Sequence, residues 1–268
     1  IHLMFQLASI TSPNIYEINF MLASLLTSLE DYDKSIEVYK EIPTKHYLGE
    51  YASIQISNLY SLEDNNKKAI EQLERFLKTN KTFDGFLSLG NYYRYDLEWK
   101  EAANAYQKAI DLGTDTDNQN LWEAYFKVGI VHERSDNWNE AENHFLKALK
   151  LYSDQPDVLN YLGYSYIDMD INMGEAKGMI EKALQQKPND PYIIDSMAWY
   201  YFKTGAYEEA KSLLEYAIDL MPYDPIINDH YGDALWKSGK NVEARFHWSK
   251  ALELDPEEET IADIKIKM

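Results

Sequence analysis

The stretch from Pro225 to Pro256 reads PIINDHYGDALWKSGKNVEARFHWSKALELDP, and it decides the fold. The preceding stretch from Pro191 to Pro222, PYIIDSMAWYYFKTGAYEEAKSLLEYAIDLMP, has the same layout. Each contains an apolar segment, a turn at Gly205 or Gly239, a second segment and a closing proline. Apolar residues in each second segment recur at steps of three and four, which is the period of an α-helix. Because proline stops a helix, each stretch is predicted to hold two helices joined by a turn.

The same pattern recurs along most of the chain at a period of about 34 residues. Its first marker is an alanine, found at Ala69, Ala102, Ala141, Ala176, Ala210 and Ala244. A second alanine follows seven residues after the first in the same predicted helix, at Ala109, Ala148, Ala183, Ala217 and Ala251. Self-similarity at such a period indicates a repeat array in which each unit packs on its neighbours. Small residues are expected where two helices cross closely, with aromatic side chains filling the gaps.

These motifs resemble those of the tetratricopeptide repeat family. In that family the first helix carries Leu-Gly followed by Tyr, and its glycine position corresponds here to Gly90, Gly129, Gly163 and Gly232. The second helix carries a large residue between its two alanines, which corresponds to Tyr106, Phe145 and Trp248. The resemblance implies an all-α fold, a right-handed α-α superhelix of about seven helix-turn-helix repeats with a C-terminal capping helix.

We expect a single solenoid domain over residues 1–268. Its repeats are predicted at about 16–48, 50–82, 83–116, 122–155, 157–190, 191–224 and 225–258, with the capping helix at 259–268. The step from Ala102 to Ala141 is longer than the others, which predicts a longer loop or a helix extension around residues 115–120. Because the first residue is Ile1, we expect the chain to begin inside a longer protein or after processing.

The formal net charge is −19, from 26 basic and 45 acidic residues. Such a chain repels polyphosphates, so we predict no nucleic-acid partner, whereas a basic segment of a protein partner would be attracted. The chain has no cysteine, which excludes disulfides, thiolate metal ligands and a cysteine nucleophile. Because no apolar run reaches the length of a membrane span, no direct span is predicted.

Residue types that carry catalysis or bind metals are not arranged in recognisable motifs. Asp168, Asp170 and Asn172 have the spacing of a calcium loop, but the glycine and the closing glutamate of such a loop are missing. The six histidines have no paired-ligand spacing, and the Asp229–His230 pair is not accompanied by a nucleophile motif. We therefore predict no catalytic residue, no cofactor and no metal, and a protein that is not an enzyme.

The first helices line a concave groove in the tetratricopeptide repeat family, and the resemblance places part of the C-terminal repeats there. The predicted partner-binding residues are Tyr164, Tyr192, Asp195, Trp199, Phe202, Asp229, Asp233 and Trp236. Aromatic side chains commonly anchor interfaces, and the carboxylates would orient a bound segment. The alternative is that Trp199 and Trp236 merely pack between repeats. A chaperone-type carboxylate clamp is not expected, because Ile54 and Leu87 occupy its lysine positions.

The sequence thus predicts a non-catalytic scaffold or adaptor that captures a peptide or helix of a partner in this groove. The C-terminal repeats look like those of bacterial envelope-type adaptor proteins, and the bacterial periplasm, the envelope and the cytoplasm all remain open as locations. One alternative is a regulatory or substrate-selecting repeat region of a larger enzyme, for example a glycosyltransferase. Another is self-association through the first unit, where Leu3, Met4, Phe5 and Leu7 would be uncovered.

Overall fold

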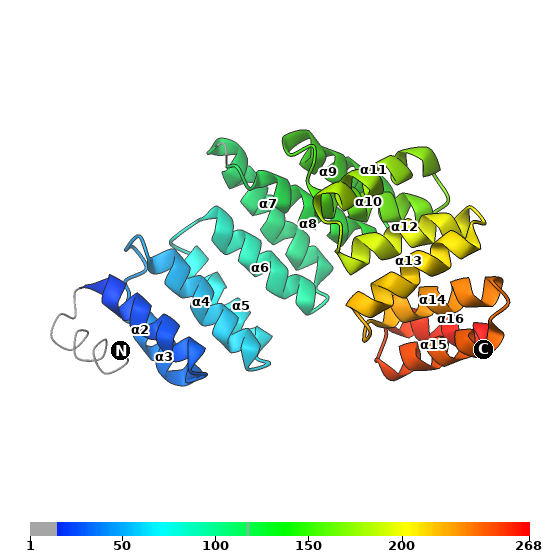
Figure 1. Cartoon of the computed structure of the whole chain (residues 1–268). Helices are drawn as coiled ribbons and strands as arrows, with labels where there is room; N and C mark the ends of the chain where they lie inside the picture. The colour runs from blue at the N-terminus through cyan, green and yellow to red at the C-terminus, as the bar shows by residue number, and fades with distance from the viewer. Residues whose placement is uncertain (1–14, 117) are drawn as a thin grey trace. The chain divides into compact units, whose positions relative to one another are not determined.

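The computed structural model describes residues 15–116 and 118–268, and all regular structure over these residues is helical (Figure 1). A first helix, a tight turn and a second helix follow one another seven times in this part of the chain, and a final helix follows the last pair. The predicted all-α repeat fold is confirmed. Within the described ranges, every helix is too short or too polar to cross a membrane.

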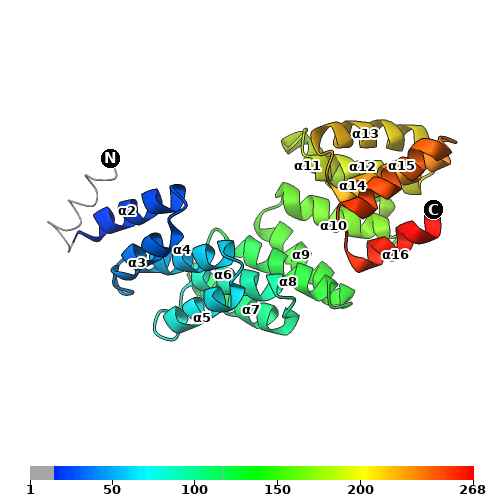
Figure 2. The same cartoon turned by 90° about the horizontal axis from the view of Figure 1, so that it is seen from below.

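Internal packing divides the chain into two compact units, Ile1–Leu151 and Tyr152–Met268. The described part of the first unit contains α2 (Tyr16–Ser28), α3 (Tyr32–Lys40), α4 (Gly49–Leu62), α5 (Asn66–Leu77), α6 (Phe83–Tyr95), α7 (Trp99–Asp115), α8 (Leu121–Glu133) and α9 (Trp138–Leu151). The second unit contains α10 (Pro156–Asp168), α11 (Met173–Gln186), α12 (Pro191–Lys203), α13 (Tyr207–Leu220), α14 (Pro225–Lys237), α15 (Asn241–Glu253) and α16 (Glu258–Lys267). In both views, the two helices of a pair lie side by side (Figure 1 and Figure 2). One continuous domain over residues 1–268 stays a prediction.

The two series of alanines lie where the two helices of each pair cross. Every alanine in both series is completely buried. Glycines of the first helices face large side chains of the second helices: a Cβ atom on Gly129 would lie 2.4 Å from the ring of Phe145, and one on Gly232 would lie 2.5 Å from the ring of Trp248. Atoms do not approach so closely in a packed interior, so the missing side chain gives the ring its space.

The ends of the first helices in the second unit are set by proline, aspartate and glycine. Pro191 and Pro225 occupy the first turn of α12 and α14, where a backbone N–H donor is not needed. Asp224 caps α14, because its carboxylate accepts a hydrogen bond from a backbone N–H of that turn at 2.9 Å. The turns that follow α12 and α14 place Gly205 and Gly239 at φ values of 84° and 77°, a region that favours glycine.

Two predictions for the first unit have different outcomes. The long step between Ala102 and Ala141 is accompanied by an extended second helix, α7, which has 17 residues. This agrees with the predicted helix extension. The apolar residues on which the predicted self-association depends lie outside the described residues, so that association stays a prediction; they are Leu3, Met4, Phe5 and Leu7.

The final helix, α16, covers the end of the second unit. Ile264 is completely buried in a cluster with Leu235 and Trp248, whereas Ile266 is 84% exposed. The buried side chain of Ile264 thus closes the last repeat, so α16 is the capping helix that the sequence predicts. Its last residue, Lys267, reaches side chains of α14.

Candidate functional site

The predicted partner-binding residues lie on α10, α12 and α14, the first helices of the second unit. Helix α12 contacts both of the others. We call the surface formed by these residues the first-helix face: Tyr164 on α10, then Tyr192, Asp195, Trp199 and Phe202 on α12, then Asp229, Asp233 and Trp236 on α14. Most of them lie close to His230 or Lys267, two side chains that are not among the predicted site residues.

His230 of α14 is the centre of the first group. Its imidazole is buried, and Nδ1 lies 2.9 and 3.0 Å from the two carboxylate oxygens of Asp195 on α12. Burial lowers the pKa of His230, but the Asp195 carboxylate, with support from Asp229 and Asp233, raises that pKa overall above its ordinary value. The hydrogen-bonded contact between His230 and Asp195 therefore ties α14 to α12 in the interior of the unit.

Trp199 packs between Phe202 and His230. The indole stacks on Phe202 with a centroid distance of 4.8 Å and on His230 with one of 4.1 Å. Its Nε1 is buried and has no hydrogen-bond partner among the described residues. Trp199 therefore takes part in the packing of this group, which is the alternative that the sequence left open for it. A direct contact between Trp199 and a partner stays a prediction.

Asp229 and Asp233 form the second group together with Lys267. They stand one helical turn apart on α14, and their side chains are 10% and 11% exposed. The Lys267 ammonium lies 2.9 and 3.0 Å from the oxygens of Asp229 and 2.8 Å from Oδ2 of Asp233. Oδ1 of Asp233 accepts a hydrogen bond from the indole N–H of Trp248 at 3.1 Å. We call Asp229 and Asp233 the acidic pair.

The pKa shifts in this group reflect burial together with charges held close to one another. Burial, and then repulsion from Asp233, raise the pKa of Asp229, although Lys267 opposes this. Burial lowers the pKa of Lys267, but the two carboxylates outweigh that effect and raise it overall. The acidic pair thus depends on a cation for its stability. Sequence alone gave no sign of this contact, because Lys267 is 38 residues from Asp229 and 34 from Asp233.

Tyr192 and Trp236 are the most exposed of the predicted residues, at 52% and 36%. Tyr192 stands in the first turn of α12, where burial and then the nearby Asp224 raise its pKa. Trp236 packs against the buried Trp248 with a centroid distance of 5.5 Å. These two aromatic side chains of the first-helix face are therefore the ones most accessible to a partner.

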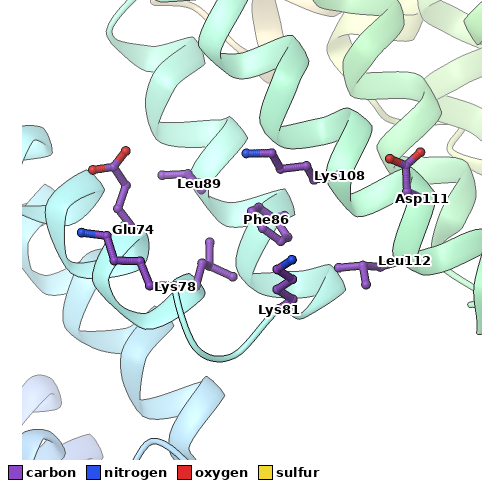
Figure 3. A pocket seen from close by; sticks show the side chains of 9 residues that line it. Glu74, Lys78, Lys81, Phe86, Leu89, Lys108, Asp111 and Leu112 are labelled. Carbon is purple, nitrogen blue, oxygen red and sulfur yellow. The ribbon is translucent and has the colours of Figure 1, made fainter.

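A cavity of about 660 Å³ lies in the first unit, between α5, α6 and α7 (Figure 3). Apolar side chains, including Phe86 and Leu89, line its interior. Its other lining residues include charges of both signs, namely Lys78, Lys81, Lys108, Glu74 and Asp111. Both carboxylates already accept hydrogen bonds within the unit, from Tyr93 and Gln107 respectively. The cavity therefore presents apolar side chains together with charges of both signs.

The loop with the spacing of a calcium site makes an ion pair with α12. The ammonium of Lys203 lies 3.0 Å from the Asp170 carboxylate and donates to the backbone carbonyl of Asp168 at 3.1 Å. This loop is thus tied to the end of α12 by a lysine. Across the described part of the chain, no three histidine or carboxylate side chains converge as a metal site would require.

Two segments of the chain match the tetratricopeptide repeat family, residues 16–42 in the first repeat and residues 122–155 in the fourth. A curated TPR repeat-containing protein of Pseudomonas aeruginosa is 43% identical over 54 residues. That match covers 19% of this chain and 9% of the Pseudomonas protein. The chain therefore corresponds to a small part of that relative.

Several solved structures share the fold over nearly the whole chain. A tetratricopeptide repeat protein of Parabacteroides merdae has a TM-score of 0.71 at 16% identity, covering 93% of this chain and 96% of that one. A chain of the APC/C Cut9–Hcn1 complex has a TM-score of 0.73 at 15% identity, covering 98% and 51%. Yeast Tom70 has a TM-score of 0.62 at 14% identity, covering 99% and 57%. At such identities the likeness shows the superhelical repeat fold alone.

Proposed function

The chain is a tetratricopeptide repeat protein, and we propose that it captures a peptide or helix of a partner protein on the first-helix face of its second unit. The observation that carries this proposal is the exposure of two aromatic side chains, Tyr192 and Trp236, on neighbouring first helices. A few large aromatic residues commonly supply most of the binding energy of an interface. An amphipathic segment lying across α12 and α14 would bury both side chains.

We propose a non-catalytic role for this face. A general base must be able to reach a proton of the substrate. Here, Nδ1 of His230 contacts Asp195, and the imidazole is buried and stacked on Trp199. The acidic pair contacts Lys267 and Trp248. These titratable groups bind one another, so the arrangement supports a scaffold in preference to acid–base chemistry.

The proposal extends to the chemistry and the setting of the partner. A net charge of −19 favours a partner with a basic segment, because long-range attraction raises the rate of encounter. The similarity to a Pseudomonas aeruginosa protein supports a bacterial setting, and a role in an envelope complex is our proposal within that setting.

A pull-down with an aromatic double variant tests the proposal. We expect the Tyr192→Ala, Trp236→Ala protein to lose the partners that the unaltered protein recovers, while its far-UV circular dichroism stays unchanged. Trp199 is unsuitable for this test because it packs against His230. The matched control is Phe246→Ala, which removes an aromatic side chain that is 64% exposed on a second helix, α15. Recovery of the same partners by the double variant would overturn the proposal.

A further inference from the structure

The acidic pair binds Lys267 of α16 and lies beside an exposed aromatic side chain of α14. Asp229, Asp233 and Trp236 are spaced four and three residues apart on α14, so they share one side of that helix. The first two hold an ammonium group, and the third is an exposed aromatic side chain. A charged subsite and an apolar anchor therefore stand next to each other on the proposed binding surface.

The chain itself supplies the ligand now bound at this subsite. Lys267 comes from a different element, α16, and its ammonium makes contacts of 2.8 to 3.0 Å with three carboxylate oxygens. A lysine ammonium is a compact charge with three donors, so the three contacts match its capacity. The geometry thus identifies the cation that this pair of carboxylates accepts.

Helix α16 is attached to the rest of the unit by few side chains. Ile264 is its completely buried apolar side chain, and Lys267 supplies its ionic contact with α14. Segments with few buried contacts open locally at low free energy. Lys267 can therefore leave the acidic pair without unfolding of the repeats.

We propose that the acidic pair is a lysine-binding subsite of the first-helix face, and that Lys267 is an internal occupant which a lysine of the partner replaces. This inference rests on the proposed function and adds to it the chemistry of one contact. Exchange of one ammonium for another keeps both carboxylates paired, whereas an empty subsite would leave two buried like charges close together. A lysine of the partner binds only the molecules in which Lys267 has left the acidic pair. Its apparent association constant is therefore the intrinsic constant multiplied by the fraction of molecules whose subsite is free.

Two single-charge variants of α16 test this proposal. Lys267→Gln removes the internal occupant, and Lys265→Gln is the matched control because it removes the same charge from an exposed position of the same helix. We expect pentalysine to bind Lys267→Gln about tenfold more tightly than Lys265→Gln in calorimetric titrations. A further change, Asp233→Asn in the Lys267→Gln background, should cancel this gain. Equal affinity of the two single variants for pentalysine would overturn the proposal.

A second measurement uses the unaltered protein and holds even if Lys267→Gln folds poorly. Pentalysine should displace Lys267 and so accelerate hydrogen exchange of the α16 amides, while pentaglutamate should not. Unchanged exchange of α16 at saturating pentalysine would also contradict the inference. The pull-down with the Tyr192 and Trp236 variant is read independently, so failure of the lysine subsite can be distinguished from failure of partner capture.

Discussion

At the scale of single residues, the close approach of paired helices depends on the absence of side-chain atoms. Gly232 faces the indole of Trp248, and that indole is held by its own hydrogen bond to Asp233. Trp248 is 2% exposed, so it has little room to move aside. Gly178 of α11 differs, because a Cβ atom there would meet no other atom within 4 Å. Identical glycine substitutions should therefore have opposite effects at these two positions.

We predict that Gly232→Ala lowers the free energy of unfolding by about 1–3 kcal/mol, because the added methyl group overpacks the contact with Trp248. Gly178→Ala should raise it by about 0.5–1 kcal/mol, because alanine favours the helix more than glycine does. Urea unfolding followed by circular dichroism measures both changes. Destabilisation of similar size in both variants would argue against the packing explanation.

At the scale of elements, α16 both covers the end of the last repeat and contributes a side chain to the first-helix face. Its inner side contributes Ile264 to the cluster around Trp248, and its end contributes Lys267 to the acidic pair. Ile266 belongs to the same helix but is 84% exposed. Ile264 is thus the completely buried apolar side chain among the described residues of α16, and the exposed Ile266 serves as a comparison.

We predict that Ile264→Ala weakens the docking of α16, with a cost of about 2–4 kcal/mol if the cavity it leaves does not collapse. Hydrogen exchange of the α16 amides should become faster, while exchange in α12 stays close to that of the unaltered protein. Ile266→Ala removes the same atoms from an exposed position and should leave α16 unchanged. Equal acceleration in the two variants would contradict the assignment of Ile264 as the anchor.

At the scale of the whole molecule, the net charge acts on a partner in a different way from the individual ion pairs. The net charge of −19 is spread over a chain whose second unit holds its own buried ionic contacts at His230 and Lys267. The distributed charge acts on a partner at a distance and is screened by salt, whereas buried pairs are screened much less. Encounter with a basic partner should therefore be sensitive to salt, even where the bound complex is not.

We predict that the association rate with the recovered partner falls about tenfold or more between low and physiological ionic strength, because the distributed charge steers the encounter. The dissociation rate should change much less, since it depends on contacts already made. Stopped-flow fluorescence of the tryptophans measures both rates. An association rate that is independent of ionic strength would reject electrostatic steering.

The repeat architecture could be predicted from the sequence because its determinants are local and recur. The alanine spacing placed the helix crossings, and these alanines are completely buried. Gly205 and Gly239 marked turns that the structure contains with positive φ values. The helix period that spaces these alanines recurs from repeat to repeat. The repetition itself is therefore the signal.

The chemistry of the first-helix face was decided by the tertiary structure. The sequence predicts Asp195, Asp229 and Asp233 there, but the side chains that meet them, His230 and Lys267, are brought in by packing over 34 to 38 residues. Helix period fixes which side of a helix a residue occupies, and so it predicts which side chains share a face. Which charge meets which depends on how successive helices stack and where α16 docks. The sequence by itself therefore determined the fold and the candidate face, and the tertiary structure decided that its carboxylates bind cations of the same chain, because pairing between distant elements follows no local rule.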